Sequence, residues 1–176
     1  MLAKYLGVWR QACVDHKRLT TTLAATTNDN FTVTPLEMHY ANKDCTGDVV
    51  ATGSYGGPSE TVKYSDSVNA SITLKDGSTI QKDVNAATSS IATATFTLTG
   101  SGVKGNTNIG GTTYTQIQYA DVVLPVLYKE RTLNGGTTYG ALLLLNESSP
   151  NEELLTLIPV AGAPNYAFKV NLQFFR

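Results

Sequence analysis

Short runs of alternating apolar and polar residues recur along this chain, and they constrain its fold more than any other feature. The clearest run covers residues 168–174, where phenylalanine, valine and leucine alternate with lysine, asparagine and glutamine. An early run over residues 7–14 places Trp9 and Cys13 on one face. Side chains two positions apart share one face of a β-strand, so this period predicts strands with one buried face.

Turn signals separate these runs at intervals of about 8–12 residues, and no amphipathic helical pattern competes with them. Asp76-Gly77 is the strongest hairpin signal, and residues 28–30 read Asn-Asp-Asn. We therefore expect an all-β fold, an antiparallel up-and-down β-barrel of about eight to ten strands, with a β-sandwich as the alternative. No linker or internal repeat interrupts the pattern, so residues 1–176 are expected to form a single β-barrel domain.

A proline complicates the strand expected over residues 31–42. Phe31 begins an alternation that Pro35 interrupts, after which Leu36, Met38 and Tyr40 take the opposite parity. Proline cannot donate a ladder hydrogen bond, so it requires a strand edge or a bulge. The pattern predicts one long bent strand in which Met38 and Tyr40 face inward.

Four further segments are assigned from composition as much as from period. Residues 83–92 could continue a strand or form a small helix, and we favour a loop or short helix there. Residues 100–111, rich in glycine and asparagine, predict a flexible loop. Residues 112–124 predict one long strand. The Asn-Gly-Gly sequence within residues 133–136 predicts the turn of a hairpin.

Composition indicates an exported protein and excludes several partner classes. Charged residues make up 15% of the chain, against roughly 25% in typical soluble proteins, and the net charge is −1. Without a basic cluster we expect no nucleic-acid partner, and no run of about 18 apolar residues predicts a membrane span. Residues 1–3 are too short for a signal peptide, so an extracellular or periplasmic form is expected to have lost one.

The two cysteines, Cys13 and Cys45, lie about 30 residues apart. They could be two unrelated buried thiols, but the low surface charge favours an oxidising compartment and hence a disulfide. The only histidines, His16 and His39, belong to no cluster of metal ligands. We therefore predict no metal site and no cofactor.

Gly7-x-Trp9 at the start of the first strand resembles the G-x-W signature of lipocalins and related calycins. In that family the tryptophan closes one end of a barrel, and an arginine from the last strand packs across its indole. The resemblance assigns that part to Arg176. The family usually has a helix after this arginine, whereas the sequence here ends at it. Cys45-Thr46-Gly47 is similar to small exported bacterial lipocalin-like proteins.

No catalytic motif stands out, so we do not expect an enzyme. The chain lacks the G-x-S-x-G elbow of hydrolases, and neither cysteine has a histidine at a suggestive spacing. We expect His16 in a surface turn and His39 on the solvent face of a strand. An enzyme of the calycin type is kept as a third hypothesis, after the binding protein and the assembly subunit described next.

The aromatic residues suggest a binding function. Tyrosine combines a broad apolar ring with a hydroxyl, and an eight-stranded barrel is wide enough for one small ligand. We expect the barrel interior to hold a small apolar or amphipathic molecule. The alternative is a cell-surface assembly subunit that self-associates by edge-strand pairing. The residues predicted to bind the ligand are Tyr40, Tyr55, Tyr64, Tyr114, Tyr119, Met38 and Phe96.

Overall fold

The computed structural model describes residues 2–127 and 132–176, and the predicted all-β fold is confirmed within them. These residues contain thirteen strands, one short 3-10 helix and no α-helix, and no helix in this part could cross a membrane. The elements are η1 (Leu2–Tyr5), β1 (Gly7–Arg10), β2 (Lys17–Ala25), β3 (Asn30–Tyr40), β4 (Val49–Ser54), β5 (Glu60–Thr73), β6 (Thr79–Thr95), β7 (Thr97–Thr99), β8 (Val103–Ile109), β9 (Thr112–Gln118), β10 (Val123–Leu127), β11 (Thr132–Leu145), β12 (Glu153–Pro159) and β13 (Ala167–Phe175).

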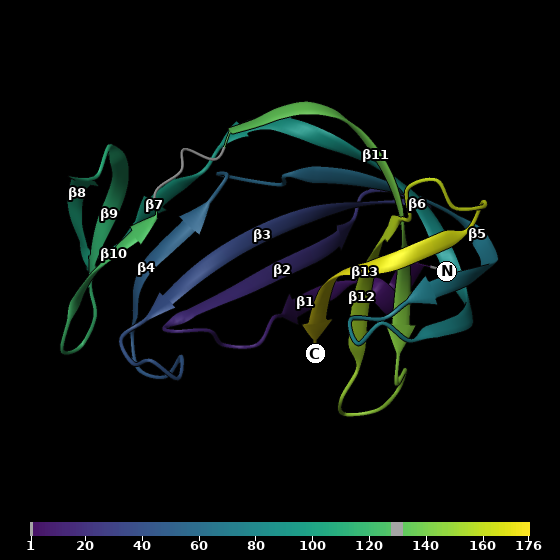
Figure 1. Cartoon of the computed structure of the whole chain (residues 1–176), viewed down its shortest axis with the longest axis horizontal. Coiled ribbons are helices and arrows are strands. Elements are labelled where there is room, and N and C mark those ends of the chain that lie inside the picture. The colour runs from purple at the N-terminus through teal and green to yellow at the C-terminus, as the bar shows by residue number, and fades with distance from the viewer. Residues whose placement is uncertain (1, 128–131) are drawn as a thin grey trace.

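Strand pairing closes a ring of eight strands, in the order β1, β2, β3, β5, β6, β11, β12 and β13. Its neighbours are antiparallel throughout, and β13 returns to β1 at Arg10 and Phe175. Strands β4 and β7 extend the sheet beyond β3, and a separate three-stranded sheet contains β8, β9 and β10. Figure 1 shows β6 and β11 arching over β2 and β3, with β8–β10 at one end of an elongated molecule and both termini toward the other.

Pro35 lies where β3 changes partners. The first half of β3, up to Val33, pairs with β5, and the second half, from Leu36, pairs with β4. Pro35 therefore needs no donor on that edge, as expected for a strand proline. It does not change the register with β2, however, and the pairing runs unbroken from Lys17 with His39 to Ala25 with Phe31. The predicted change of parity after Pro35 is therefore wrong.

The strands enclose two apolar cores on opposite faces of β11 and β12. Leu142 and Leu154 belong to the first, which contains Trp9 and lies inside the eight-strand ring. Leu143 and Leu155 belong to the second. This second core is bounded by β5, β6, β11, β12 and β13, because the start of β13 also pairs in parallel with the end of β5. Adjacent residues of one strand thus stabilise separate cores, as the two-residue period of a strand allows.

Two bulges allow β5 and β13 to contribute to both cores. The β12–β13 register shifts at Thr156 and Leu157, which leaves Asn171 as an extra residue in β13. Phe174 consequently packs in the first core and Phe168 in the second, although both belong to one alternating run. The β5–β6 register shifts in the same way after Tyr64. A one-residue bulge reverses the face of every following side chain, so each strand changes cores without breaking.

Several local predictions are corrected by this arrangement. The predicted loop or helix at residues 83–92 is the middle of β6, which contains buried Ala86 and Ala87. The predicted hairpin at residues 133–136 is strand β11 paired with β6 in one register; residues 128–131 lie outside the described residues. Residues 100–111 contain β8, and the strand predicted at residues 112–124 is the β9–β10 hairpin. The Asp76-Gly77 hairpin is confirmed, joining β5 to β6.

The disulfide between Cys13 and Cys45 is confirmed, and it joins the β1–β2 connection to the β3–β4 connection. Backbone hydrogen bonds support the same junction, where His16 donates to Lys43 and Tyr40 donates to His16. The crosslink closes a loop with a sequence separation of 32 residues. Closing a loop of that size restricts the unfolded chain far more than the folded one.

Replacing both cysteines, as Cys13→Ala with Cys45→Ala, is therefore expected to lower the free energy of unfolding by roughly 3–4 kcal/mol. Urea unfolding followed by circular dichroism measures this change. Reductant should destabilise the unsubstituted protein by a similar amount and leave the double variant unaffected. Equal midpoints for both proteins without reductant would show that the crosslink contributes nothing.

Candidate functional site: a pocket inside the strand ring

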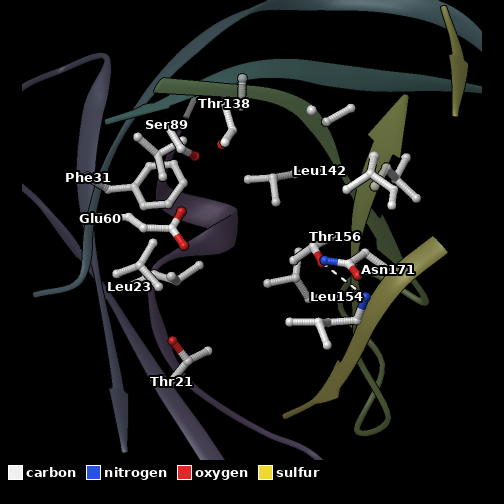
Figure 2. Close-up of a pocket in the computed structure, with 18 of the residues that line it drawn as sticks. Thr21, Leu23, Phe31, Glu60, Ser89, Thr138, Leu142, Leu154, Thr156 and Asn171 are labelled. Atoms are coloured by element: carbon white, nitrogen blue, oxygen red, sulfur yellow. Dashed lines mark hydrogen bonds between the residues drawn. The ribbon is translucent and has the colours of Figure 1, made fainter. Parts of the chain in front are cut away.

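A cavity of about 380 Å³ lies inside the eight-strand ring, beside the first core. Figure 2 shows it between two walls: Thr21, Leu23, Phe31 and Glu60 on one side, and residues of β11, β12 and β13 on the other. The volume falls within the range of small-molecule sites. Its lining residues are Thr21, Leu23, Phe31, Val33, Glu60, Val62, Ala87, Ser89, Ile91, Thr138, Tyr139, Gly140, Ala141, Leu142, Leu154, Thr156, Leu157, Ile158, Asn171, Leu172 and Phe174.

Strand register explains why these side chains meet in the pocket. Residues directly opposite in antiparallel strands point to the same face. Glu60 lies opposite Val33 on one neighbouring strand and opposite Ile91 on the other, and all three line the cavity. Thr21 is a residue of β2 and lies opposite Pro35 of β3. It precedes Leu23 by two residues, so both side chains point to the same inner face. Most of the lining is thus the inner face of the ring, and Ala141 and Leu157 of the second core complete it.

Two polar groups in this lining lack a protein partner among the described residues. The hydroxyl oxygen of Thr21 is buried without a hydrogen-bond partner in the described part of the chain, and the residue is only 5% exposed. Glu60 is half-buried, and the ion pairs formed among the described residues involve other carboxylates. An unsatisfied buried hydroxyl costs roughly 1–3 kcal/mol, so the fold retains Thr21 at a cost in stability.

The indole of Trp9 is completely buried beside this pocket, and its Nε1 donates a hydrogen bond of 2.7 Å to the Tyr5 carbonyl. The guanidinium carbon of Arg176 lies 4.2 Å from the centre of the Trp9 ring. This is the contact that the lipocalin resemblance implied for the two residues. A cation over an indole face is attracted by the ring quadrupole, which fastens the end of the chain to the first core.

Arg176 also joins two other segments, the N-terminal residues before β1 and the connection before β12. Its Nη1 donates to the Leu6 carbonyl at 2.6 Å, and its Nη2 donates to the Lys4 carbonyl at 3.2 Å. Its Nε donates to the Glu152 carboxylate at 2.7 Å, and this hydrogen bond holds the pKa of Glu152 below its usual value. Gly7 lies directly under the guanidinium, because a Cβ there would be 3.4 Å from Nη1, and its φ of +115° suits glycine.

None of the seven residues predicted to bind ligand lines this cavity. Met38 and Tyr40 are directed to the opposite face of β3, because its parity does not change at Pro35. Their contact is with each other, through a Tyr40 hydroxyl donating to the Met38 sulfur at 3.6 Å. Tyr64 packs edge-on against Tyr5 in the first core, with ring centres 5.8 Å apart.

The remaining predicted residues lie toward the other end of the sheet. Phe96 packs on Gly53, where the ring occupies the space of a side chain, and its ring centre is 5.5 Å from that of Tyr55. Tyr114 is half-buried in β9, away from the cavity lining. Tyr119 follows the end of β9 and packs in a third cluster between the two sheets. The aromatic composition therefore did not identify the pocket.

A buried polar cluster surrounds Tyr119, outside the pocket. His39 contacts the Tyr119 hydroxyl through Nδ1 and the Glu37 carboxylate through Nε2, each at 2.9 Å. His16 stacks on the Tyr119 ring with centres 3.9 Å apart. His16 lies in the predicted turn but is 6% exposed, so its predicted surface position is wrong. His39 is 1% exposed, so its predicted solvent-facing position is also wrong. The prediction for His39 assumed the wrong parity of β3, and the prediction for His16 assumed that a polar turn is exposed.

This cluster forms one continuous hydrogen-bonded chain. With the Nε2–H of His39 donating to Glu37, Nδ1 accepts from the Tyr119 hydroxyl, and every polar atom is satisfied. Burial and the nearby Glu37 charge raise the pKa of Tyr119 to about 12. Buried satisfied networks of this kind join elements with defined geometry. Here the network fastens the β8–β10 sheet to β3. No cluster among the described residues is arranged to hold a metal ion.

Arg176→Ala should lower the free energy of unfolding by about 2 kcal/mol, because it removes the cation–π contact and several charge-assisted hydrogen bonds. The single tryptophan reports directly, and its emission should shift to longer wavelength as water reaches the indole.

The ion pair between Arg176 and Glu152 is present above pH ~4.3 and is lost as the pH falls through the lowered pKa of Glu152. Glu152→Gln should therefore reduce the loss of stability in acid and leave the emission unchanged.

Tyr119→Phe should cost about 1–3 kcal/mol, because it leaves a buried nitrogen of His39 without its partner. The raised pKa adds a pH dependence: its stabilisation is complete below pH ~10 and is lost as the pH rises through about 12. Chemical unfolding between pH 8 and 12 should show this alkaline loss in the unsubstituted protein and a flatter profile in the variant. Tyr114→Phe is the matched control, and an equal effect there would contradict the network.

Comparisons with family models, curated proteins and solved structures found no match to this chain. The functional interpretation therefore depends on the geometry and chemistry of the pocket.

Proposed function

We propose that this chain is an exported, non-enzymatic, lipocalin-like binding protein that holds one small apolar or amphipathic molecule inside the strand ring. The observation that carries the proposal is the cavity of about 380 Å³, whose walls combine aliphatic and aromatic side chains with a few polar groups. This combination is typical of small-molecule sites, in which apolar contact supplies affinity and polar groups set orientation.

The distribution of reactive groups favours binding over catalysis. Among the described residues, the cavity lining includes one carboxylate, Glu60, and no histidine, cysteine, lysine or arginine. General acid–base chemistry usually needs a titratable group within reach of substrate and a partner that tunes it. The pair that resembles such an arrangement, Glu37 and His39, is 5% and 1% exposed and lies elsewhere.

An order-of-magnitude estimate sets the affinity to look for. Burying about 250 Å² of apolar ligand surface contributes roughly 6 kcal/mol before the costs of association. With polar contacts offsetting the costs of association, a net value of about 6 kcal/mol corresponds to a dissociation constant of tens of micromolar. Binding experiments at tens of micromolar protein are therefore sensitive enough.

An extracellular or periplasmic location is part of the proposal. It is supported by the Cys13–Cys45 disulfide, since such bonds persist mainly in oxidising compartments. The low content of charged residues, 15%, points in the same direction.

A second candidate is an assembly subunit that pairs strands between copies. The terminal strand β13 does not favour it, because β13 pairs with β12 along its length. The edge strand β10 favours this candidate, because it has one neighbour among the described strands. Three exposed apolar residues lie at its start: Val122, Val123 and Leu124. Long exposed apolar edges are typical sites of self-association.

The substitution Thr138→Trp tests the binding function. Thr138 is exposed at the pocket, and a large side chain there should fill the entrance and weaken binding of N-phenyl-1-naphthylamine, a neutral apolar fluorescent probe, by about tenfold or more. Thr137→Trp is the matched control, since Thr137 is the adjacent residue of β11, is also exposed, and is not part of the lining.

Equal binding by the two variants, or no binding by the unsubstituted protein, would contradict the proposal. Native mass spectrometry of the same samples distinguishes the second candidate. Retained ligand on a monomer supports binding, whereas ligand-free oligomers that Leu124→Lys disperses support assembly through β10.

A further inference from the structure

Resting on the proposed function, we infer that the pocket selects amphipathic ligands that carry a protonated amine, with the ammonium group paired to Glu60. Thr21 supplies a second polar contact for the same ligand. The occupant is thus a cationic amphiphile and not a fatty acid or a neutral lipid.

Glu60 faces the cavity from the first residue of β5. Figure 2 shows its carboxylate directed into the pocket between Phe31 and Leu23. Both neighbours in register, Val33 and Ile91, are apolar residues of the same lining. Because the lining has no lysine, arginine or histidine among the described residues, no protein cation inside the pocket competes for this carboxylate.

Charge decides which ligands fit beside such a group. A neutral hydrocarbon placed against Glu60 removes water from the carboxylate and returns no compensating interaction. A fatty acid adds a second negative charge in an environment of reduced dielectric constant, where repulsion is stronger than in water. An alkylammonium ion replaces the lost hydration with a charge-assisted hydrogen bond, so only this class gains from the presence of Glu60.

Thr21 provides an independent reason to expect a polar atom on the ligand. Its hydroxyl is buried, has no partner among the described residues, and belongs to the same wall as Glu60. Buried hydroxyls almost always have a hydrogen-bond partner, and exceptions mark sites that a ligand or water completes. A hydroxyl can accept a hydrogen bond from a ligand donor or donate one to a ligand acceptor. In register, Val33 and Leu23 separate Glu60 from the strand position of Thr21, so the hydroxyl offers a polar contact on the same wall that is distinct from the carboxylate.

The test compares three probes of equal chain length by calorimetry at pH 7: decylamine, decanol and decanoate, each below its micelle concentration. Decylamine should bind about tenfold tighter than decanol, and decanoate should bind most weakly. Glu60→Gln should reduce the preference for decylamine over decanol to within about threefold and leave decanol binding unchanged or tighter. Glu147→Gln is the matched control, an exposed acid outside the lining, and should retain the preference.

Thr21→Val gives a second, nearly isosteric measurement. It should leave the preference for decylamine over decanol unchanged, because that preference depends on Glu60, and it should raise the melting temperature, because an unpaired buried hydroxyl is removed. Loss of the preference in this variant would contradict the assignment to Glu60.

The outcomes separate this inference from the function on which it rests. If no probe binds, both the binding function and the amine selectivity are wrong. If decanol binds but decylamine binds no tighter, or Glu60→Gln leaves the preference intact, the selectivity is wrong and the binding function stands. Tightest binding of decanoate overturns the selectivity in the same way.

Discussion

The alternation of side chains along a strand, and its reversal at two bulges, is the constraint on which this structure depends. One extra residue, Asn171, separates the part of β13 that packs in the first core from the part that packs in the second. Without it, Phe168 and Phe174 would point to the same side of the sheet. The eight-strand ring and the smaller core beside it exist together because the register shifts where it does.

The same constraint determines the pocket. The inner face of the ring is filled near Trp9 by large side chains, whereas the pocket that Thr21 and Glu60 line also contains smaller polar residues such as Ser89 and Thr138. A well-packed core with apolar residues at these positions would be more stable, since an unpaired hydroxyl and a half-buried carboxylate weaken a core. Proteins commonly retain such destabilising groups at functional sites.

The features of the fold that were predictable from sequence are those determined by local chemistry. Asp76-Gly77 forms the expected hairpin, because a turn that needs positive φ selects glycine. The two cysteines pair as predicted. The segment at residues 83–92 was missed because its alanine, asparagine and serine residues resemble a connection. The segment instead forms backbone ladders with β5 on one side and β11 on the other.

The candidate site was harder to predict, for a reason that is general for sheets. Period two tells which residues share a face but not which face is inside, and Pro35 suggested a reversal that does not occur. The error placed Met38 and Tyr40 inward and His39 outward. Thr21 carries no distinguishing signal within a threonine-rich segment, and Glu60 closely follows the turn-like residues Gly56-Gly57-Pro58. Only the pairing of β3 with β5 brings Glu60 to the pocket.

The contacts of Arg176 determine when this protein can become native. The guanidinium hydrogen bonds to the backbone of Lys4 and Leu6 span 172 and 170 residues, and the ring itself closes through β13. During synthesis the first strand therefore has no partner on one side, and Trp9 lacks its covering cation, until nearly the whole chain has emerged. Folds with such high contact order assemble slowly, in milliseconds to seconds. Completion of the ring therefore depends on β13, whatever the order in which the other strands pair.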